Sequence, residues 1–224
     1  MKDELIVLGN PKSVVAESIR TLRTNLQFSS VDEEVKTILI TSTAPSEGKS
    51  FISSNLSVAF AQNNSKVLIV DCDMRKGRLH KIFGVTNEKG LSNLLIDEVE
   101  DEFKNYVRKT KIDNLYILTM GTIPPNPAEL LDSTKNKLLI KVLKEKFDYI
   151  IFDGVPTNGL TDSLIMARLV DKVVIVSSYK QTKMELLQST KRSLESVGAD
   201  IAGVIVNKMP NMHSGYGYYG HYYE

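Results

Sequence analysis

The sequence lacks several features that mark other classes of protein. Its 224 residues include one cysteine, Cys72, so no intramolecular disulfide can form, which fits a reducing cytoplasm. Only three histidines are available to activate a thiol, so we expect Cys72 to be a small buried residue. No apolar run approaches the length of a bilayer span, and the start MKDELIVLGN is not a signal peptide. The net charge of +1 gives no reason to expect nucleic acid or an anionic membrane as a partner.

What the sequence does contain is a series of short β-branched runs separated by helical patterns. The runs are almost continuously apolar, as in strands buried on both faces of a parallel sheet. They lie at 37–41, 66–71, 115–120, 149–153, 172–178 and 201–207. Helical patterns fall between them, at 49–62, 132–147 and 184–198. This alternation predicts an α/β fold with a doubly wound, mainly parallel sheet and helices on both faces, in which ligands bind beyond the carboxyl ends of the strands.

Two segments lie outside this pattern, one at each end of the chain. We therefore divide the sequence into an N-terminal arm (1–30), an α/β domain (31–209) and a C-terminal tail (210–224). The arm contains a helical stretch from about residue 13 to 29. The tail mixes glycine and serine with tyrosine and has no aliphatic run, so ordering it costs more chain entropy than its contacts return. We expect the tail to be flexible.

A phosphate loop is expected in TILITSTAPSEGKSF, where a buried strand, a loop and a helix follow one another. This is the context of a Walker A loop, whose backbone N–H groups and helix N-terminus hold phosphates. In this interpretation Lys49 neutralises the β- and γ-phosphates of ATP, and the Ser50 hydroxyl binds Mg²⁺. The predicted nucleotide-binding residues are Thr43, Ala44, Pro45, Ser46, Glu47, Gly48, Lys49, Ser50 and Phe51. Thr43 stands where the strict pattern has glycine.

Acidic residues follow two of the predicted strands. In VLIVDCDMRKG, Asp71 ends the strand and Asp73 follows it, and Asp153 ends YIIFD. Asp153 has the place of a Walker B aspartate that holds Mg²⁺, while Asp71 and Asp73 can orient the metal or accept a proton from an attacking hydroxyl. The alternative is that these carboxylates only cap the following turns and helices. Three of them beside a phosphate loop favour a catalytic set of Lys49, Asp71, Asp73 and Asp153, with Ser50, Asp71 and Asp153 at the metal.

TSTAPSEGKS, VLIVDCDMRKG and YIIFDGVP resemble the Walker A, A′ and B motifs of the bacterial tyrosine kinases that regulate capsule and exopolysaccharide synthesis. GTIPPNPAELLDS is similar to the Pro-rich stretch of that family. Glu17, Arg20 and Arg23 match its oligomerisation motif. The last nine residues hold Tyr216, Tyr218, Tyr219, Tyr222 and Tyr223, which match its autophosphorylation tail. The resemblance runs nearly end to end.

The resemblance implies a P-loop NTPase-like fold and an ATP- and Mg²⁺-dependent protein-tyrosine kinase. It implies a homo-oligomer, with a ring as the family's arrangement, in which the tail of one subunit enters the active site of the next. It also implies a cytoplasmic module that a separate transmembrane adaptor recruits to the inner face of the membrane. Further tyrosine-containing proteins are expected as substrates, and nucleic acid is not. Asp71 is the first choice for activating the hydroxyl, with Asp73 in support.

The sequence also departs from the family pattern. Ser46 stands where the loop usually has glycine, and Asp153-Gly-Val-Pro156 replaces a more usual Asp-Thr-Pro-Pro. Asn207, after the last strand, resembles the residue that contacts adenine in related P-loop proteins, although an asparagine that caps a turn would look the same. Asp162 is expected to begin a helix. Arg75 has two possible partners, a phosphate or an acidic neighbour.

An alternative function from the same superfamily is a partition or cell-division ATPase that acts as a nucleotide-switched assembly protein without tyrosine phosphorylation. Those ATPases carry a second lysine early in the phosphate loop, where this chain has Ala44. The tyrosine-rich tail is also unexplained by that function. Both observations favour the kinase. For the arm, spacing alone favours a solvated charged face, and only the resemblance points to a role between subunits.

Overall fold

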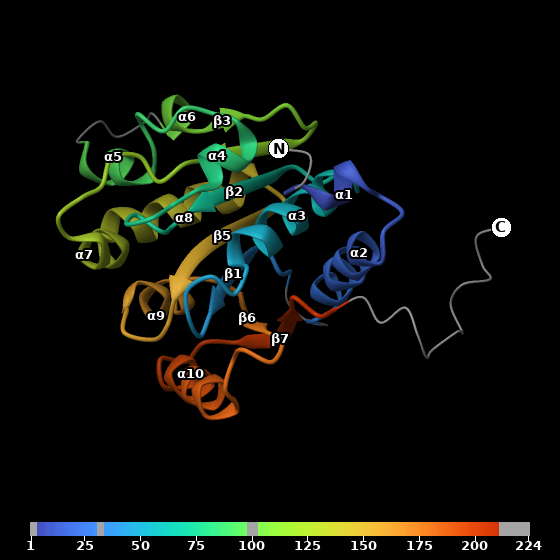
Figure 1. Cartoon of the computed structure of the whole chain (residues 1–224). Coiled ribbons are helices and arrows are strands. Elements are labelled where there is room, and N and C mark those ends of the chain that lie inside the picture. The colour runs from blue at the N-terminus through green and yellow to red at the C-terminus, as the bar shows by residue number, and fades with distance from the viewer. Residues whose placement is uncertain (1–3, 31–33, 98–102, 211–224) are drawn as a thin grey trace.

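The structure, a computed structural model, describes residues 4–30, 34–97 and 103–210 (Figure 1). One seven-stranded sheet runs through it in the order β3-β4-β2-β5-β1-β6-β7. All neighbouring strands are parallel except β3, which is antiparallel to β4 at one edge. The strands are β1 (Thr37–Ser42), β2 (Val67–Asp71), β3 (Arg108–Lys109), β4 (Leu115–Leu118), β5 (Tyr149–Pro156), β6 (Lys172–Ser178) and β7 (Ile201–Asn207).

Helices cover both faces of this sheet (Figure 1). On one face α3 packs directly on the central strands, and α1 and α2 pack on α3. The helices associated with this face are α1 (Ile6–Gly9), α2 (Val14–Gln27), α3 (Lys49–Ala61) and α4 (Leu79–Phe83). The others are α5 (Leu91–Ile96), α6 (Phe103–Tyr106), α7 (Pro127–Asp132), α8 (Thr134–Lys146), α9 (Asp162–Ala167) and α10 (Met184–Ser196). The predicted doubly wound α/β fold is confirmed.

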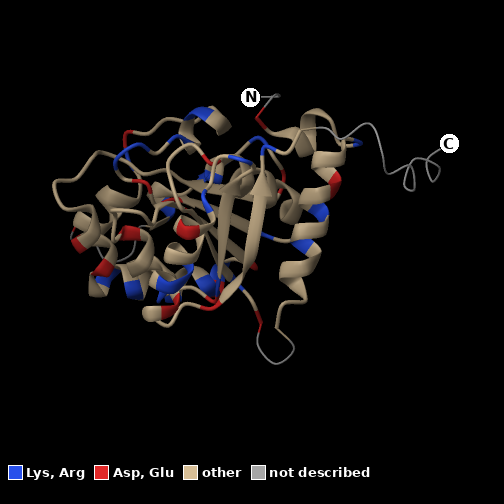
Figure 2. Cartoon of the chain, turned by 60° about the horizontal axis from the view of Figure 1, so that its bottom comes forward, with Lys and Arg blue, Asp and Glu red and all other residues tan. Residues whose placement is uncertain are grey.

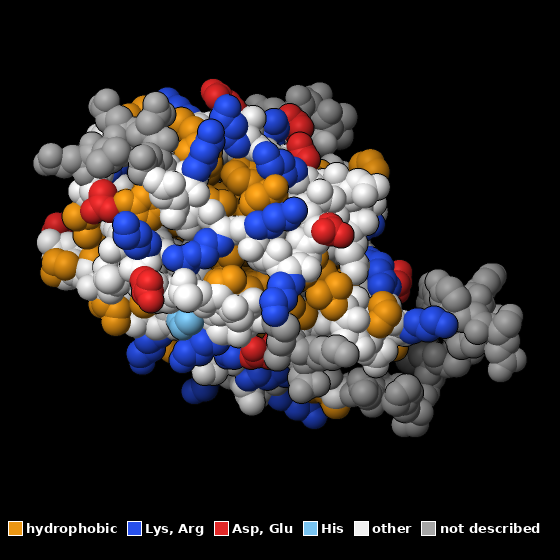
Figure 3. Space-filling model, turned by 90° about the horizontal axis from the view of Figure 1, so that it is seen from above, with side chains coloured by type: hydrophobic (Ala, Val, Ile, Leu, Met, Phe, Trp, Pro, Cys, Tyr) orange, Lys and Arg blue, Asp and Glu red, His pale blue; other side chains and the backbone are white. Residues whose placement is uncertain are grey.

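Two hydrophobic clusters, one on each face of the sheet, explain why the strands are apolar throughout. In β1, Ile38 and Ile40 belong to the cluster beneath α3, whereas Leu39 belongs to the cluster on the opposite face. In β5, Ile151 and Ile150 divide in the same way. Successive residues of a strand point to opposite faces, so a sheet that is covered twice needs apolar residues at every position. Charged residues belong mainly to helices and loops (Figure 2). On the face seen in Figure 3, basic side chains are more prominent than acidic ones.

Some elements differ from the prediction in their bounds. The predicted helix at 132–147 is α8, which begins two residues later because Ser133 is extended, and the short helix α7 before it was not predicted. The Ser133 hydroxyl accepts a hydrogen bond from the backbone N–H of Asn136 at 3.1 Å, which caps α8. β5 continues to Pro156, three residues beyond the predicted end. The two-residue strand β3 gave no pattern long enough to be recognised in the sequence.

The N-terminal arm packs tightly on the helix that follows the phosphate loop. Leu5, Val7 and Ile19 are buried in the same cluster as α3. The Asn55 side chain, also buried, accepts a hydrogen bond from the backbone N–H of Val7 at 3.1 Å and donates one to the carbonyl of Glu4 at 2.8 Å. The arm therefore rests on the element that begins at the candidate site. Within the described ranges, every helix is too short or too polar to cross a lipid bilayer.

Candidate active site

The phosphate loop joins the end of β1 to the start of α3, and its backbone is shaped for an anion. Ser46 and Gly48 have φ values of 64° and 104°, in the left-handed region. In the described part of the chain, no acceptor contacts the backbone N–H groups of residues 46–51. A run of free N–H groups at the N-terminus of a helix attracts phosphate oxygens. The loop is thus ready to hold the phosphates of a nucleotide.

The end of β7 lies against this loop. The Asn207 side-chain amide donates to the carbonyl of Glu47 at 2.9 Å, and Lys208 Nζ donates to the carbonyl of Ser46 at 2.7 Å. A Cβ on Gly48 would fall 2.0 Å from Asn207 Nδ2, so only glycine allows this approach. Asn207, predicted from its place after the last strand, is beside the loop. Sequence reasoning missed Lys208, although it follows the same strand end.

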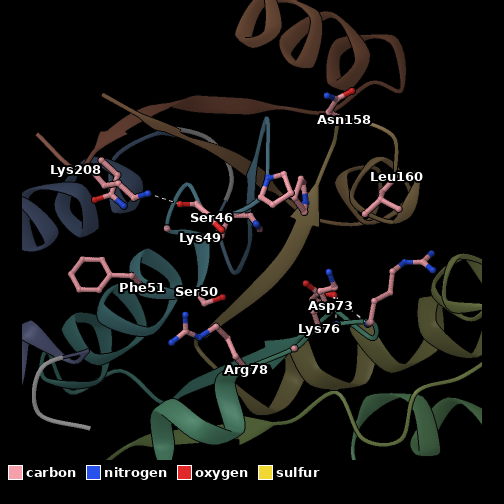
Figure 4. A pocket seen from close by; sticks show the side chains of 16 residues that line it. Ser46, Lys49, Ser50, Phe51, Asp73, Lys76, Arg78, Asn158, Leu160 and Lys208 are labelled. Carbon is pink, nitrogen blue, oxygen red and sulfur yellow. Dashed lines mark hydrogen bonds between the residues drawn. The ribbon is translucent and has the colours of Figure 1, made fainter. Parts of the chain in front are cut away.

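These residues border a cavity of about 770 Å³ (Figure 4). Figure 4 shows Ser46, Lys49 and Ser50 on one side and Asp73, Lys76 and Arg78 on the other. Of the predicted nucleotide-binding residues, those that line the cavity are Pro45, Ser46, Gly48, Lys49, Ser50, Phe51 and Asn207. Thr43, Ala44 and Glu47 belong to the loop but not to the cavity lining.

Lys49 is largely buried, with 9% of its surface exposed. Burial lowers the pKa of its ammonium group, and the negative charges of Asp153, Asp73 and Glu47 oppose this shift. A desolvated lysine that lines the cavity interacts strongly with any anion that enters it. The predicted role of Lys49 at the nucleotide phosphates therefore fits its environment.

Asp153 lies in β5 and is 1% exposed, and it is not among the residues that line the cavity. Burial raises the pKa of its carboxyl to about 6, while the nearby hydroxyl of Ser50, the charge of Lys49 and the hydroxyl of Ser53 act in the opposite direction. Its Oδ1 atom is buried and has no hydrogen-bond partner. A buried, unpartnered carboxylate oxygen next to a serine hydroxyl suits a hard cation such as Mg²⁺.

Asp71 is fully buried at the end of β2, in register with Asp153 on the neighbouring strand. Its oxygens accept hydrogen bonds from the backbone N–H groups of Leu79 at 3.1 Å and Asp73 at 3.3 Å. Burial and then the charge of Asp153 raise its pKa well above the ordinary value. Gly77 covers it so closely that a Cβ there would fall 2.6 Å from both carboxylate oxygens. Two carboxylates so placed repel each other unless a proton or cation lies near them.

Asp73, in contrast, lines the cavity. Its carboxylate accepts hydrogen bonds from the backbone N–H groups of Arg75 at 3.1 Å and Lys76 at 2.8 Å, which fix the turn after β2. Cys72, between the two aspartates, is buried as predicted, and burial raises the pKa of its thiol well above the ordinary value. A thiol of this kind is not a nucleophile at neutral pH.

Arg75 forms an ion pair with Asp162, the first residue of α9, at 3.2 Å. Of the two partners considered from the sequence, the structure therefore gives the acidic neighbour. Asp162 is 2% exposed and begins its helix as predicted. Nothing local in the sequence connects these residues, because β5 brings α9 beside the turn after β2 only in the folded sheet.

Within the described ranges, no group of three or more His, Cys, Asp and Glu side chains has the spacing of a metal site. This does not conflict with the geometry above. Mg²⁺ in nucleotide sites uses one or two protein ligands, and phosphates and waters complete its coordination. Ser50, Asp153 and Asp71 are the residues that fit such an ion.

Comparison with known proteins agrees with this geometry. Residues 35–202 match the family described as an AAA domain. Putative tyrosine-protein kinase CapB of Staphylococcus aureus is 38% identical over 96% of this chain and 94% of its own length. Tyrosine-protein kinase YwqD of Bacillus subtilis is 39% identical over 98% of this chain and 92% of its own length. The chain belongs to the bacterial tyrosine kinases. The crystal structure of the chimerical protein CapA2B2 has a TM-score of 0.88 and 39% identity, and the match covers 93% of this bacterial tyrosine kinase and 91% of that chain.

The cell-division ATPases are more distant from this bacterial tyrosine kinase. The MinD structure from Pyrococcus furiosus has a TM-score of 0.65 at 27% identity and covers 76% of this chain and 71% of its own. The similarity shows a shared nucleotide-binding fold and does not favour the ATPase alternative. At the position of those ATPases' second lysine, Ala44 donates its backbone N–H to the Glu47 carboxylate at 2.9 Å.

The three arm residues named above make two kinds of contact in this kinase. Glu17 and Arg20 form an ion pair at 2.8 Å on the outer side of α2. Arg23 instead donates to the carbonyl of Ala59 at 3.2 Å, near the C-terminal end of α3. The five tyrosines of the tail, Tyr216, Tyr218, Tyr219, Tyr222 and Tyr223, lie outside the described residues.

Proposed function

We propose that the chain is a kinase that transfers the γ-phosphoryl group of ATP to tyrosine hydroxyls, chiefly Tyr216, Tyr218, Tyr219, Tyr222 and Tyr223 of a neighbouring copy. One observation carries this proposal. A phosphate loop with free N–H groups faces the Asp73 carboxylate across a cavity, in a chain whose relatives are named tyrosine-protein kinases. Phosphoryl transfer needs this combination of anion-binding donors and a carboxylate near the attacking hydroxyl.

The groups of the site divide the tasks of this mechanism among them, and Asp71 takes part in two of these tasks. The loop N–H groups and Lys49 hold the phosphates and stabilise the charge that develops on them. Ser50, Asp153 and Asp71 would hold Mg²⁺, which supplies further neutralisation of the phosphate charge when it is bound. The tyrosine oxygen forms the new bond to the γ-phosphorus as the bond to the β–γ bridging oxygen breaks, and ADP leaves.

The tyrosine proton passes to an aspartate, for which we propose Asp71 with Asp73 in support. Asp73 already faces the cavity, whereas Asp71 lies beneath Gly77. Proton transfer to Asp71 therefore requires the segment 73–78 to move when substrates bind. A carboxylate whose pKa is raised by burial is a better proton acceptor than an exposed one.

The assembly proposal places Glu17 and Arg20 at the contact between copies. Both lie on the outer side of α2, and Glu17 is exposed. Arg23 would act indirectly, since its bond to Ala59 holds α2 on α3. The arrangement of copies would be a ring, located in the cytoplasm and recruited to the inner face of the membrane by a separate transmembrane adaptor. Control of capsule or exopolysaccharide synthesis would follow from tail phosphorylation, which adds charge and loosens the assembly.

Phosphotyrosine mapping by mass spectrometry tests the activity. The protein is treated with phosphatase, incubated with Mg²⁺-ATP, and compared with Lys49→Met and with Lys191→Met, a matched change at an exposed lysine of α10. We expect phosphate on the five tail tyrosines of the wild type and the Lys191→Met variant and none on Lys49→Met. ATP hydrolysis without phosphotyrosine would contradict the kinase proposal and favour the function of a nucleotide-switched ATPase.

Analytical ultracentrifugation tests the assembly. Arg20→Ala should dissociate the oligomer and leave the melting temperature nearly unchanged, because an exposed ion pair adds little stability. Arg23→Ala should lower the melting temperature by several degrees, since Ala59 loses its donor. A monomer under every nucleotide condition would contradict the ring.

A further inference from the structure

Glu47 is an acidic residue inside a loop that is built for phosphates. It is 4% exposed, and its charge is close enough to act on Lys49. A carboxylate near bound phosphate groups is electrostatically unfavourable. A carboxylate at this position must therefore stabilise the loop by something other than its charge, and its hydrogen bonds do so.

The Glu47 carboxylate closes the loop on itself. Its Oε2 atom accepts the backbone N–H groups of Thr43 at 2.8 Å and Ala44 at 2.9 Å. The Thr43 hydroxyl donates to both carboxylate oxygens, at 2.8 Å and 3.0 Å. The first N–H groups of the loop are therefore satisfied from within, while those of residues 46–51 stay without an acceptor in the described part of the chain. This division keeps the later N–H groups available for a ligand.

A second contact ties the same carboxylate to another strand end. The Thr182 hydroxyl, in the segment between β6 and α10, donates to Glu47 Oε1. Thr182 Oγ1 in turn accepts the backbone N–H of Ser178, the last residue of β6, at 2.8 Å. The Glu47 carbonyl accepts from Asn207 at the end of β7. Three strand ends thus meet at Glu47, and the loop conformation depends on two segments far from it in sequence.

We propose that Glu47 is a positioning residue for the nucleotide phosphates and that Thr182 holds Glu47 in place. The carboxylate would not contact the nucleotide. It would fix Thr43 and Ala44 so that the N–H groups of residues 46–51 converge before ligand binds, which lowers the cost of ordering the loop on binding. The inference rests on the proposed function only in requiring that the loop binds a nucleotide.

The first test replaces the Thr182 hydroxyl and measures the dissociation constant of Mg²⁺-ADP by isothermal titration calorimetry. Thr182→Val, which keeps the shape and removes the donor, should weaken binding about fivefold, whereas Thr182→Ser should stay within about twofold of the wild type. The matched control is Thr190→Val. Thr190 is a buried threonine of α10 whose hydroxyl accepts a hydrogen bond from the Thr157 hydroxyl and makes none with the phosphate loop. It should bind ADP like the wild type.

The second test separates hydrogen bonding from charge at Glu47. Glu47→Ala leaves the two N–H groups without an acceptor and should weaken ADP binding about tenfold or more. Glu47→Gln should stay within about threefold of the wild type, because its amide oxygen accepts the N–H groups and its NH₂ can donate to the threonine hydroxyls. Melting temperatures without nucleotide identify a variant that has lost its fold. If a Glu47 variant does so, the ADP affinities of Thr182→Val and Thr182→Ser decide the test.

The inference is overturned if Thr182→Val binds ADP as tightly as the wild type, or if Thr182→Ser loses as much affinity as Thr182→Val. A Glu47→Gln variant as weak as Glu47→Ala would also overturn it, since charge would then be the cause. These results do not depend on tyrosine phosphorylation. If the wild type phosphorylates no tyrosine but the ADP affinities follow the expected order, the kinase proposal fails and the role of Glu47 stands.

Discussion

The phosphate loop, residues 43–50, and the carboxylate cluster, Asp71, Asp73 and Asp153, are neighbours in the fold but are stabilised differently. The loop is held by its own hydrogen bonds and by residues from β6 and β7, so its shape exists without a ligand. The cluster holds two fully buried carboxylates with raised pKa values and one carboxylate oxygen without a partner. The loop is therefore preorganised, whereas the cluster is strained until a cation or proton arrives. A site that must bind a metal nucleotide and release it benefits from both properties.

The largest effect is expected where the cluster meets the metal. Asp153→Asn should reduce tyrosine phosphorylation about 100-fold or more, because a neutral amide no longer offsets the charge of Mg²⁺ bound to the nucleotide. The initial rate of phosphate incorporation at saturating Mg²⁺-ATP measures this. Asp113→Asn, at an exposed loop position, should be as active as the wild type. Full activity of Asp153→Asn would show that Asp153 has no part in the mechanism.

The next comparison lies within the cluster, between a sealed and an accessible aspartate. Asp71→Asn should lower the turnover rate about 100-fold and Asp73→Asn about tenfold, because Asp71 is proposed as the proton acceptor. Calorimetry checks binding: Asp73→Asn should keep the Mg²⁺-ADP affinity of the wild type within a small factor, whereas Asp71→Asn, which also removes a proposed Mg²⁺ ligand, should bind Mg²⁺-ADP more weakly. The reverse order of the two rates would assign the proton to Asp73, the aspartate that already faces the cavity.

The strain in the cluster also predicts a pH-dependent stability of the nucleotide-free protein. The pKa of the Asp153 carboxyl is about 6 in the folded protein and 3.8 ordinarily, so the folded state holds this proton more tightly. Its contribution to stability is fully present below pH 3.8 and is lost as the pH rises through 6. At pH 7 the Asp153→Asn variant should therefore melt about 5 °C above the wild type, and the difference should shrink as the pH falls towards 4.

Thermal unfolding without nucleotide, from pH 4 to pH 7.5, measures this difference. Asp113→Asn again serves as the control and should follow the wild type at every pH. A constant offset between Asp153→Asn and the wild type across this range would mean that burial of the charge is not the cause. Together with the activity assay, the variant would show opposite effects on stability and on function.

The smallest effect is expected in the loop, at Ser46. A non-glycine residue at φ 64° costs about 1 kcal/mol, but glycine there gains freedom in the unfolded chain. Ser46→Gly should therefore change the melting temperature by about 2 °C or less and the ADP affinity by less than about threefold. Asn64→Gly, at φ 60° beyond the other end of α3, is the control for the backbone effect. A tenfold loss of affinity in Ser46→Gly alone would show that the serine hydroxyl contacts the nucleotide.

Most of the fold was predictable from the sequence because the signals are local. Each run that we predicted as a strand is one. The central strands are apolar at every position because both faces of the sheet are covered there, whereas alternate residues of β7 at the edge are exposed. The short helix α4 and the two-residue strand β3 were missed, because so few residues show no periodicity. The six-residue helix α7 was missed as well, whereas α8 begins within two residues of the helix predicted at 132–147.

The sequence by itself determined the phosphate loop, the order of the strands along the chain and the three aspartates at strand ends. Each of these depends only on residues that are close together in the sequence. Only the tertiary structure decided that Asp71 is sealed while Asp73 is open, that Arg75 pairs with Asp162, and that Arg23 reaches Ala59. It likewise brought Thr182, Asn207 and Lys208 to the loop. The reason is that β1 lies between β5 and β6, and β7 lies beyond β6, so residues distant in sequence meet at one edge of the sheet. Burial there, which local sequence does not report, sets the charge state of each group.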